Sequence, residues 1–213
     1  INSFKIIMIL KIFLRTLISY RFSLVKIIFF ELFFLLKGNK GNRFTISKNE
    51  IMTDSIPCPY YFLYKIKKKI VNNNCKLLLD LGCGSGRVID FFNKGLLNKN
   101  FIGIEYFEKH FLYCKKNFEI DKNIKLIKAN FIDYDFLQYN ADCYFFNDPI
   151  KNDKTSIDVL KKIANSPHAK DGILLIVVNC NNVVLNALKN VQCIKKYYIN
   201  DKKGFSIYRI NKK

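Results

Sequence analysis

Histidine is scarce in this sequence, and its cysteines lack the spacing of a metal or disulfide site. Only His110 and His168 occur in 213 residues, so a histidine metal site is not expected. The seven cysteines include no C-x-x-C pair and are odd in number, which argues against a disulfide framework. We therefore expect reduced, mostly buried thiols in a cytoplasmic protein that binds no metal.

Acidic residues are also few. The chain has 36 Lys and Arg against 17 Asp and Glu, a net charge of +19, which normally points to nucleic acid or an anionic membrane surface. Lysine, isoleucine, asparagine and phenylalanine are abundant along the whole chain, however, as an AT-rich coding bias would produce. We therefore give the charge only about half of its usual weight as an indication of partners.

A long uncharged run is missing as well. Residues 1–36 are strongly apolar, but charged residues interrupt them, and a spanning helix needs about 20 nearly uncharged residues. On a helical wheel one face of this segment is polar. It gathers Lys5, Lys11, Arg15, Thr16, Ser19, Ser23 and Lys26. Arg21 and Glu31 fall off that face. Three interpretations stay open: an interfacial helix on an anionic bilayer at the inner face of the membrane, a lid on the main domain, or ordinary helices packed on the core.

One main domain with an appendage fits the length of the chain. Residues 37–43 form a polar, glycine-containing break, where we expect a linker. We therefore divide the chain into a basic amphipathic helical extension with its linker, residues 1–43, and a main domain, residues 44–213.

The most informative stretch of that domain is a strand, a glycine turn and a helix. Leu77 to Leu79 form a short apolar run that ends in Asp80, and Gly82, Gly84 and Gly86 follow at every second position. Such glycines let the backbone turn tightly against a ligand, and a helix from Arg87 to Lys94 would direct its first N–H groups at that ligand. Cys83 lies inside the turn. We interpret it as a small side chain that fits there rather than as a redox residue.

The residues around the turn distinguish the ligand classes that use it. A phosphate-binding P-loop needs Gly-Lys-Ser/Thr, whereas Arg87 and Val88 follow Gly86. A dinucleotide fold prefers G-x-G-x-x-G, whereas the spacing here is G-x-G-x-G. A second apolar strand, residues 101–105, ends in Glu105, whose carboxylate can accept both hydroxyls of an adenosine ribose. The sequence therefore predicts recognition of a ribose.

The pattern D-x-G-x-G-x-G resembles motif I of the class I S-adenosylmethionine-dependent methyltransferases, with Asp80, Gly82, Gly84 and Gly86 in its fixed positions. The resemblance covers about residues 56–210. It implies an α/β, doubly wound, mostly parallel seven-stranded sheet with a C-terminal antiparallel hairpin, preceded here by the N-terminal helical extension. It also implies S-adenosylmethionine as cofactor.

The remaining apolar patterns agree with that order of elements. We expect the helix at residues 106–118 to turn Phe107, Phe111, Leu112 and Cys114 inward. The other helices are expected at residues 62–71, 154–163 and 183–188. Further strands are expected at residues 124–128, 142–146, 172–179, 193–199 and 205–210, the last two joined by a turn over residues 200–204.

The resemblance also suggests roles for site residues. The family commonly has an acid at the position of Asn130, whose amide oxygen can still accept a hydrogen bond from the adenine amino group, and Phe131 or Ile132 would supply an apolar wall. Tyr60 and Tyr61 would either line the methionine end of the cofactor or serve aromatic packing. The full set expected to bind the cofactor is Asp80, Gly82, Cys83, Gly84, Gly86, Glu105, Tyr106, Asn130, Phe131 and Asn147.

The strand at residues 142–146 brings Asn147 and Asp148 to the edge of the sheet where an open α/β fold places its chemistry. Methyltransferases that act on amino groups often carry Asn/Asp-Pro-Pro-aromatic there, but Ile150 and Lys151 replace the last two residues. Residues 144–150 instead resemble a bacterial class I subgroup of undefined substrate, with Phe-Asn-Pro-Phe-like sequences, into which Asp148 is inserted. We predict Asn147 and Asp148 as the catalytic residues.

The sequence thus favours methyl transfer to an undetermined acceptor, with an amine or amide nitrogen preferred. A protein lysine, a lipid, another small molecule and a nucleic acid base all remain open as acceptors. Two other functions also remain open: a non-catalytic S-adenosylmethionine-binding or membrane-associated module, and a nicotinamide-dependent oxidoreductase, which the glycine spacing disfavours.

Overall fold

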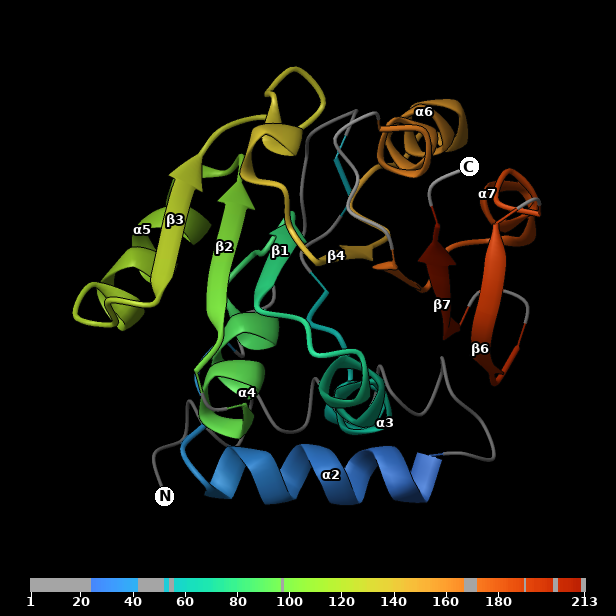
Figure 1. Cartoon of the computed structure of the whole chain (residues 1–213). Helices are drawn as coiled ribbons and strands as arrows, with labels where there is room; N and C mark the ends of the chain where they lie inside the picture. Colours follow the sequence, from blue (N-terminus) through green and yellow to red (C-terminus); the bar gives the residue numbers. More distant parts are fainter. Residues whose placement is uncertain are drawn as a thin grey trace.

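A seven-stranded sheet forms the centre of the computed structural model, which describes residues 24–41, 52–53, 56–96, 98–166, 172–189, 191–200 and 203–211. The strand order is β3-β2-β1-β4-β5-β7-β6 (Figure 1). The neighbours from β3 to β5 pair parallel, and β7 pairs antiparallel with both β5 and β6. The predicted fold class is confirmed. The strands are β1 (Leu77–Leu81), β2 (Asn100–Glu105), β3 (Ile124–Lys128), β4 (Cys143–Asn147), β5 (Ile173–Val178), β6 (Gln192–Tyr198) and β7 (Gly204–Ile210).

Helices alternate with the first five strands. The predicted helices of the main domain are present and differ from their expected bounds by a few residues at most, whereas the 3-10 helix η2 was not predicted. The helices are α2 (Leu24–Leu36), α3 (Tyr60–Asn72), α4 (Arg87–Gly95), α5 (Glu108–Phe118), η2 (Phe136–Tyr139), α6 (Asp153–Ala164) and α7 (Asn182–Asn186).

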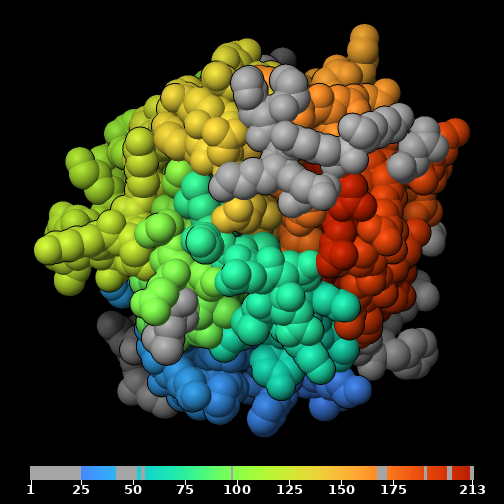
Figure 2. Space-filling model, viewed as in Figure 1, coloured from blue at the N-terminus to red at the C-terminus, as the bar shows by residue number. Residues whose placement is uncertain are grey.

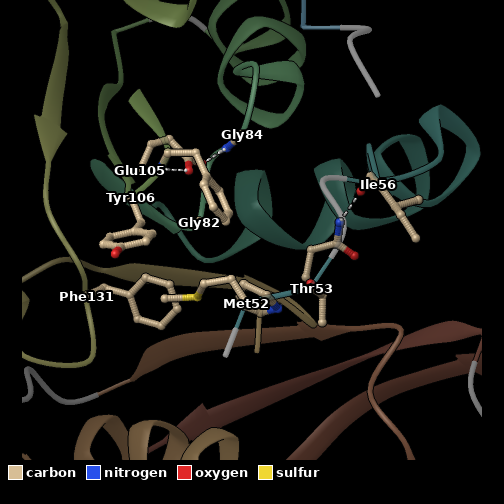
Figure 3. Close-up of a pocket in the computed structure, with 11 residues that line it drawn as sticks. Met52, Thr53, Ile56, Gly82, Gly84, Glu105, Tyr106 and Phe131 are labelled. Atoms are coloured by element: carbon tan, nitrogen blue, oxygen red, sulfur yellow. Dashed lines mark hydrogen bonds between the residues drawn. The ribbon is translucent and has the colours of Figure 1, made fainter. Parts of the chain in front are cut away.

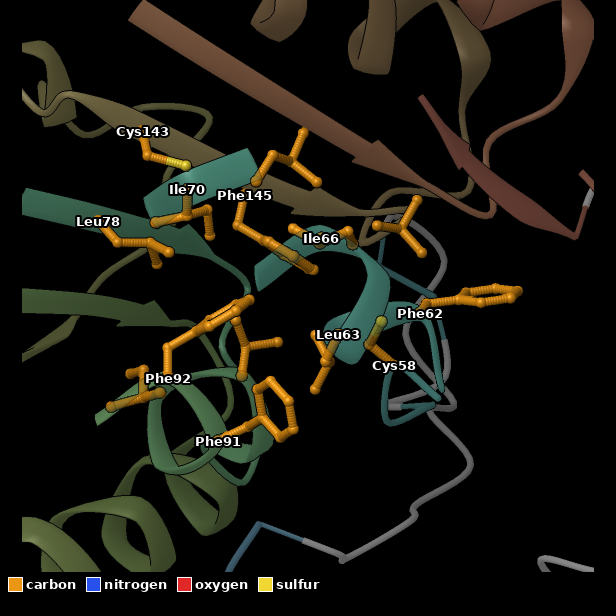
Figure 4. Close-up of a cluster of buried hydrophobic side chains, with 14 of the residues drawn as sticks. Cys58, Phe62, Leu63, Ile66, Ile70, Leu78, Phe91, Phe92, Cys143 and Phe145 are labelled. Carbon is orange, nitrogen blue, oxygen red and sulfur yellow. The ribbon is translucent and has the colours of Figure 1, made fainter. Parts of the chain in front are cut away.

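The inner strands of the sheet are buried on both faces because they are apolar at most positions, whereas the edge strands β3 and β6 carry lysines and are only partly buried. On one face the strand residues Leu78 and Phe145 pack with α3, α4 and α5; on the other, Leu79 and Phe146 pack with α6 and α7. Figure 4 shows the first cluster, in which side chains of α3 project toward β4 and toward Phe92 of α4. This two-sided core holds the carboxyl ends of the parallel strands at one edge of the sheet.

The predicted inward face of α5 is wrong at one position. Leu112 is 53% exposed, whereas Cys114 is buried as expected. The buried positions of this helix are His110, Cys114 and Phe118, a stripe of every fourth residue that is narrower than the predicted face. Leu112 lies off that stripe, so its apolar character alone was misleading.

Helix α2 packs beside α3 along one edge of the molecule (Figures 1 and 2). Ile27 and Glu31 are buried in this contact, and the Phe34 ring lies 4.9 Å from that of Tyr60. Among the predicted polar-face residues Lys26 is exposed, and the others lie outside the described residues. No helix of the described segments is long and apolar enough to span a bilayer. The domain division at residues 43 and 44 stays a prediction.

Candidate active site

The candidate site lies where the sheet order changes direction, at the carboxyl ends of β1 and β4. Two cavities adjoin there, and both are lined by Ile56, Gly82, Gly84 and Asn147. The first, which we call the Glu105 cavity, also includes Glu105, Tyr106 and Phe131. The second, the Asp80 cavity, also includes Asp80, Cys83 and Arg87. In open α/β sheets ligands bind in this crevice.

The glycine turn follows β1 directly. All three glycines have positive φ angles, 77° at Gly82, 55° at Gly84 and 86° at Gly86, in the region that strongly favours glycine. A Cβ on Gly82 would stand 2.8 Å from the Pro149 Cβ, and one on Gly86 would stand 2.5 Å from the Phe118 ring. Gly82, Cys83 and Gly84 line the cavities, whereas Gly86 is not among the lining residues because it packs against α5.

Glu105 at the end of β2 holds the glycine turn in place. Its Oε2 accepts a hydrogen bond from the Gly84 N–H at 2.7 Å, and its Oε1 accepts one from the Phe107 N–H at 2.7 Å (Figure 3). Burial raises the pKa of Glu105, and these backbone hydrogen bonds oppose that effect. Each carboxylate oxygen has lone pairs beyond the one already used, so Glu105 can still accept hydrogen bonds from a ligand's hydroxyls.

Asp80 lines the second cavity and has an unpaired buried polar atom. Its side chain is buried, and Oδ2 has no hydrogen-bond partner among the described residues. Burial, with a smaller contribution from the Glu105 carboxylate, raises the pKa of Asp80 to about 8. A carboxyl group in this state is largely protonated at neutral pH, and a nearby cation would favour its ionised form.

Of the three predicted site residues after β3, only Phe131 lines one of the two cavities. Asn130 uses its amide locally, donating from Nδ2 to Asp133 Oδ2 at 2.7 Å and accepting at Oδ1 from the Ile132 N–H at 3.2 Å. Neither Asn130 nor Ile132 lines a cavity, but Phe131 does. Figure 3 shows Phe131 among the residues that line the Glu105 cavity, together with Met52 and Tyr106.

The two predicted catalytic residues take different positions. Asn147 lines both cavities, donates from Nδ2 to the Ile56 carbonyl at 3.0 Å and accepts at Oδ1 from Asn179 at 3.0 Å. Asp148 lines neither cavity, and its Oδ1 accepts from the Cys180 thiol at 3.8 Å. Its φ of 41° turns the chain, and Pro149 then lies against Gly82. Their catalytic roles stay a prediction.

The chain resembles known proteins in structure but not in sequence. No family model and no curated protein sequence matches the chain. A candidate caffeoyl-CoA O-methyltransferase from Staphylococcus aureus matches in structure with a TM-score of 0.57 at 18% identity, over 87% of this chain and 92% of that one. The Salinibacter ruber RNA methyltransferase, solved with S-adenosyl-L-homocysteine, matches with a TM-score of 0.57 at 12% identity, over 74% and 95%. Aeropyrum pernix fibrillarin, solved with S-adenosyl-L-methionine, matches with a TM-score of 0.50 at 13% identity, over 63% and 66%.

The chain has the class I methyltransferase fold. Its predicted resemblance to S-adenosylmethionine-dependent methyltransferases is therefore confirmed at the level of fold.

Several residues of this class I methyltransferase fold line the site without a sequence signal. Met52 forms a β-bridge with Ile150, and Thr53 donates from its N–H to the Pro149 carbonyl at 3.1 Å and from Oγ1 to the Asp148 carbonyl at 2.7 Å. We call Met52 and Thr53 the strap. It joins segments almost a hundred residues apart, a pairing that no local periodicity reveals.

Asn179 lies beside the site, whereas Tyr60 and Tyr61 lie away from its two cavities. Asn179 is buried next to Asn147, and its Oδ1 has no partner among the described residues. Tyr60 and Tyr61 are buried but do not line either cavity. Of the two roles considered for them, they serve aromatic packing: Tyr60 stacks on Phe34, and Tyr61 lies edge-on to Phe30.

Proposed function

We propose that the protein is an S-adenosylmethionine-dependent methyltransferase whose acceptor atom is an amine or amide nitrogen. The observation that supports this best is the open glycine turn between two buried carboxyl groups, Asp80 and Glu105, on neighbouring strands. Asn147 lies at the end of the strand on the other side of β1. This places a hydrogen-bonding side chain beside the region where the cofactor would lie.

The residues of the two cavities fit such a cofactor. Glu105 would accept hydrogen bonds from the ribose hydroxyls, and Phe131 and Tyr106 would flank the adenine ring. The unpaired Oδ2 of Asp80 would face the cationic methionine end. When bound, the cofactor supplies a methyl group on a sulfonium, already activated for in-line displacement.

The chain's own contribution would be alignment of the acceptor. Methyl transfer needs a nucleophile held within about 3 to 3.5 Å of the methyl carbon. Asn147 retains hydrogen-bonding capacity at both amide atoms beyond its bonds to Ile56 and Asn179, so it would hold an acceptor N–H and orient the lone pair. Asp148 would take the proton released after transfer. The acceptor is a protein lysine, a membrane-associated lipid or small molecule, or a nucleic acid base.

Labelled methyl transfer tests this proposal. The full chain is incubated with cell extract and S-adenosylmethionine carrying a tritiated methyl group, and the extract is then separated into protein, lipid, nucleic acid and small-molecule fractions. We expect label in one fraction, and none with heat-inactivated protein. Binding of the cofactor without label in any fraction would favour the non-catalytic module and refute the enzyme.

We also propose that the outer face of α2 contacts an anionic membrane surface. Val25, Phe29 and Leu36 are 77%, 63% and 88% exposed, and Leu32 and Phe33 are exposed beside them. Lys26 and Lys37 are exposed at the two ends of this stripe, and the one acid of the helix, Glu31, is buried. An apolar stripe flanked by lysines is suited to the headgroup boundary of an anionic bilayer.

Sedimentation with vesicles tests the membrane contact. We expect the chain to sediment with phosphatidylserine-containing vesicles in low salt, and a Phe29→Ser/Phe33→Ser variant to remain in the supernatant. Vesicles of phosphatidylcholine alone are the control for charge. The proposal would be contradicted if the unmodified chain and the variant sedimented equally. It would also be contradicted if the chain associated with itself through the same face of α2 in the absence of vesicles.

A further inference from the structure

Arg87, the first residue of α4, is a buried cation at the edge of the Asp80 cavity. Its side chain is 4% exposed and lines that cavity. The Nη1 group donates to the Cys58 carbonyl at 3.2 Å, and the guanidinium carbon lies 4.3 Å from the centre of the Tyr60 ring. Because Arg87 directly follows Gly86, the last glycine of the turn, these contacts fix the point where the turn becomes helix.

Glu31 of α2 supplies the anion for this cation. Its Oε2 accepts from Arg87 Nη1 at 2.7 Å, and its Oε1 accepts from the Tyr60 N–H at 2.9 Å. Pro59 stands at the N-cap of α3 and no side chain of the cap position bonds there, so Glu31 replaces the missing cap from another helix. One carboxylate therefore joins α2, the start of α3 and the start of α4.

The residues after α2 enclose the same helix start. A Cβ on Gly41 would stand 2.2 Å from the Arg87 backbone nitrogen, so the Gly41 backbone lies directly against it. The Lys40 N–H donates to Asp90 Oδ2 at 2.8 Å, and Lys94 pairs with the same oxygen at 3.0 Å. The N-terminal segment thus contacts the first turn of α4 from two directions.

A buried ion pair of this kind is not explained by stability alone. Removing both ions from water has a cost that their attraction often fails to recover, whereas the pair fixes geometry well. The part that this pair fixes is the exit of the glycine turn, next to the Gly84 N–H and the Asp80 cavity.

We infer that Glu31 is a positioning residue for the cofactor cradle, acting through Arg87 on the conformation of the glycine turn. The N-terminal helix is then part of the binding site although none of its described residues lines a cavity. This inference rests on the proposed function, because it concerns binding of the same cofactor.

The test is the affinity of the full chain for S-adenosylhomocysteine, measured by calorimetry. Glu31→Gln keeps the size of the side chain and the acceptor for the Tyr60 N–H, and removes the charge. We expect the Kd to rise about tenfold. In an Arg87→Met background the same substitution should change the Kd little, because the group through which Glu31 acts is gone.

Controls separate positioning from stability. Ile163→Ala opens a cavity in α6 on the other face of the sheet; it should lower the free energy of unfolding and leave the Kd unchanged. If Glu31→Gln does not fold, Arg87→Lys keeps the charge but loses the planar fork, and it should weaken binding several-fold. An unchanged Kd in a less stable but folded Glu31→Gln protein, or in Arg87→Lys, overturns the inference. Failure of the wild type itself to bind would instead refute the proposed function.

Discussion

At the scale of single residues, Asp80 makes stability depend on pH. Its pKa is raised from 3.8 to about 8 in the folded protein, so the folded state keeps a proton that the unfolded chain loses above about pH 4. The corresponding stability is fully present below pH 4 and is lost as the pH rises toward 8. Asp80→Asn removes this titration.

Urea unfolding at several pH values between 5 and 8 measures the effect. The free energy of unfolding of the ligand-free wild type should fall more steeply with pH than that of Asp80→Asn, by at most about 1.4 kcal/mol per pH unit. Burial also raises the pKa of Glu105, so some slope should remain in the variant. Parallel curves for the two proteins would show that Asp80 is ionised in the folded state.

Asn147 and Asp148 should differ in what their removal changes. Because Asp148 lines neither cavity, Asp148→Ala should leave the Kd for S-adenosylhomocysteine nearly intact and lower the rate of label transfer about a hundredfold. Asn147→Ala should affect both quantities, since Asn147 lines both cavities and bonds Ile56. Asp135→Ala, which removes an exposed carboxylate elsewhere, is the matched control. Loss of cofactor binding in Asp148→Ala would contradict its proposed role.

At the scale of elements, the strap offers a test of how the site is covered. Thr53→Val keeps the shape of the side chain and removes the Oγ1 bond to the Asp148 carbonyl. A hydrogen bond of this kind contributes about 1 kcal/mol, so we expect about fivefold weaker binding of S-adenosylhomocysteine, mainly through faster dissociation in stopped flow. An unchanged dissociation rate would mean that the strap does not close over the ligand.

The same elements indicate how far the sequence determines the fold and the site. Apolar runs and glycines are local signals, so the strands, the helices of the main domain and the turn from Gly82 to Gly86 were predictable. The strap, the bond between Asn147 and Asn179, and the pair of Glu31 with Arg87 join residues 95, 32 and 56 positions apart. Such contacts arise only when the sheet brings strand ends together. For the same reason, the sequence alone showed Glu31 only as a charged residue off the polar face of a predicted helix.

At the scale of the whole molecule, the candidate cofactor site draws on the sheet and on the helix layer that covers one of its faces. Strands β1, β2 and β4 supply its floor, and α4 begins at its edge, held by α2 and α3. A ligand that binds such a site binds the folded state alone, so it should stabilise the whole chain by mass action.

Thermal unfolding provides the corresponding measurement. At a concentration about a hundred times its Kd, S-adenosylhomocysteine should add about 2.7 kcal/mol to the free energy of unfolding, which for a chain of this length raises the Tm by about 5 to 10 °C. NADH at the same concentration should not change the Tm. Each oxygen of the Glu105 carboxylate accepts one backbone N–H, from Gly84 or Phe107. Glu105→Gln loses the negative charge and one of these acceptors, so it should show a smaller shift in Tm. A shift with NADH and none with S-adenosylhomocysteine would favour the nicotinamide-dependent oxidoreductase, since an adenosine-binding crevice at this edge of the sheet serves both cofactors.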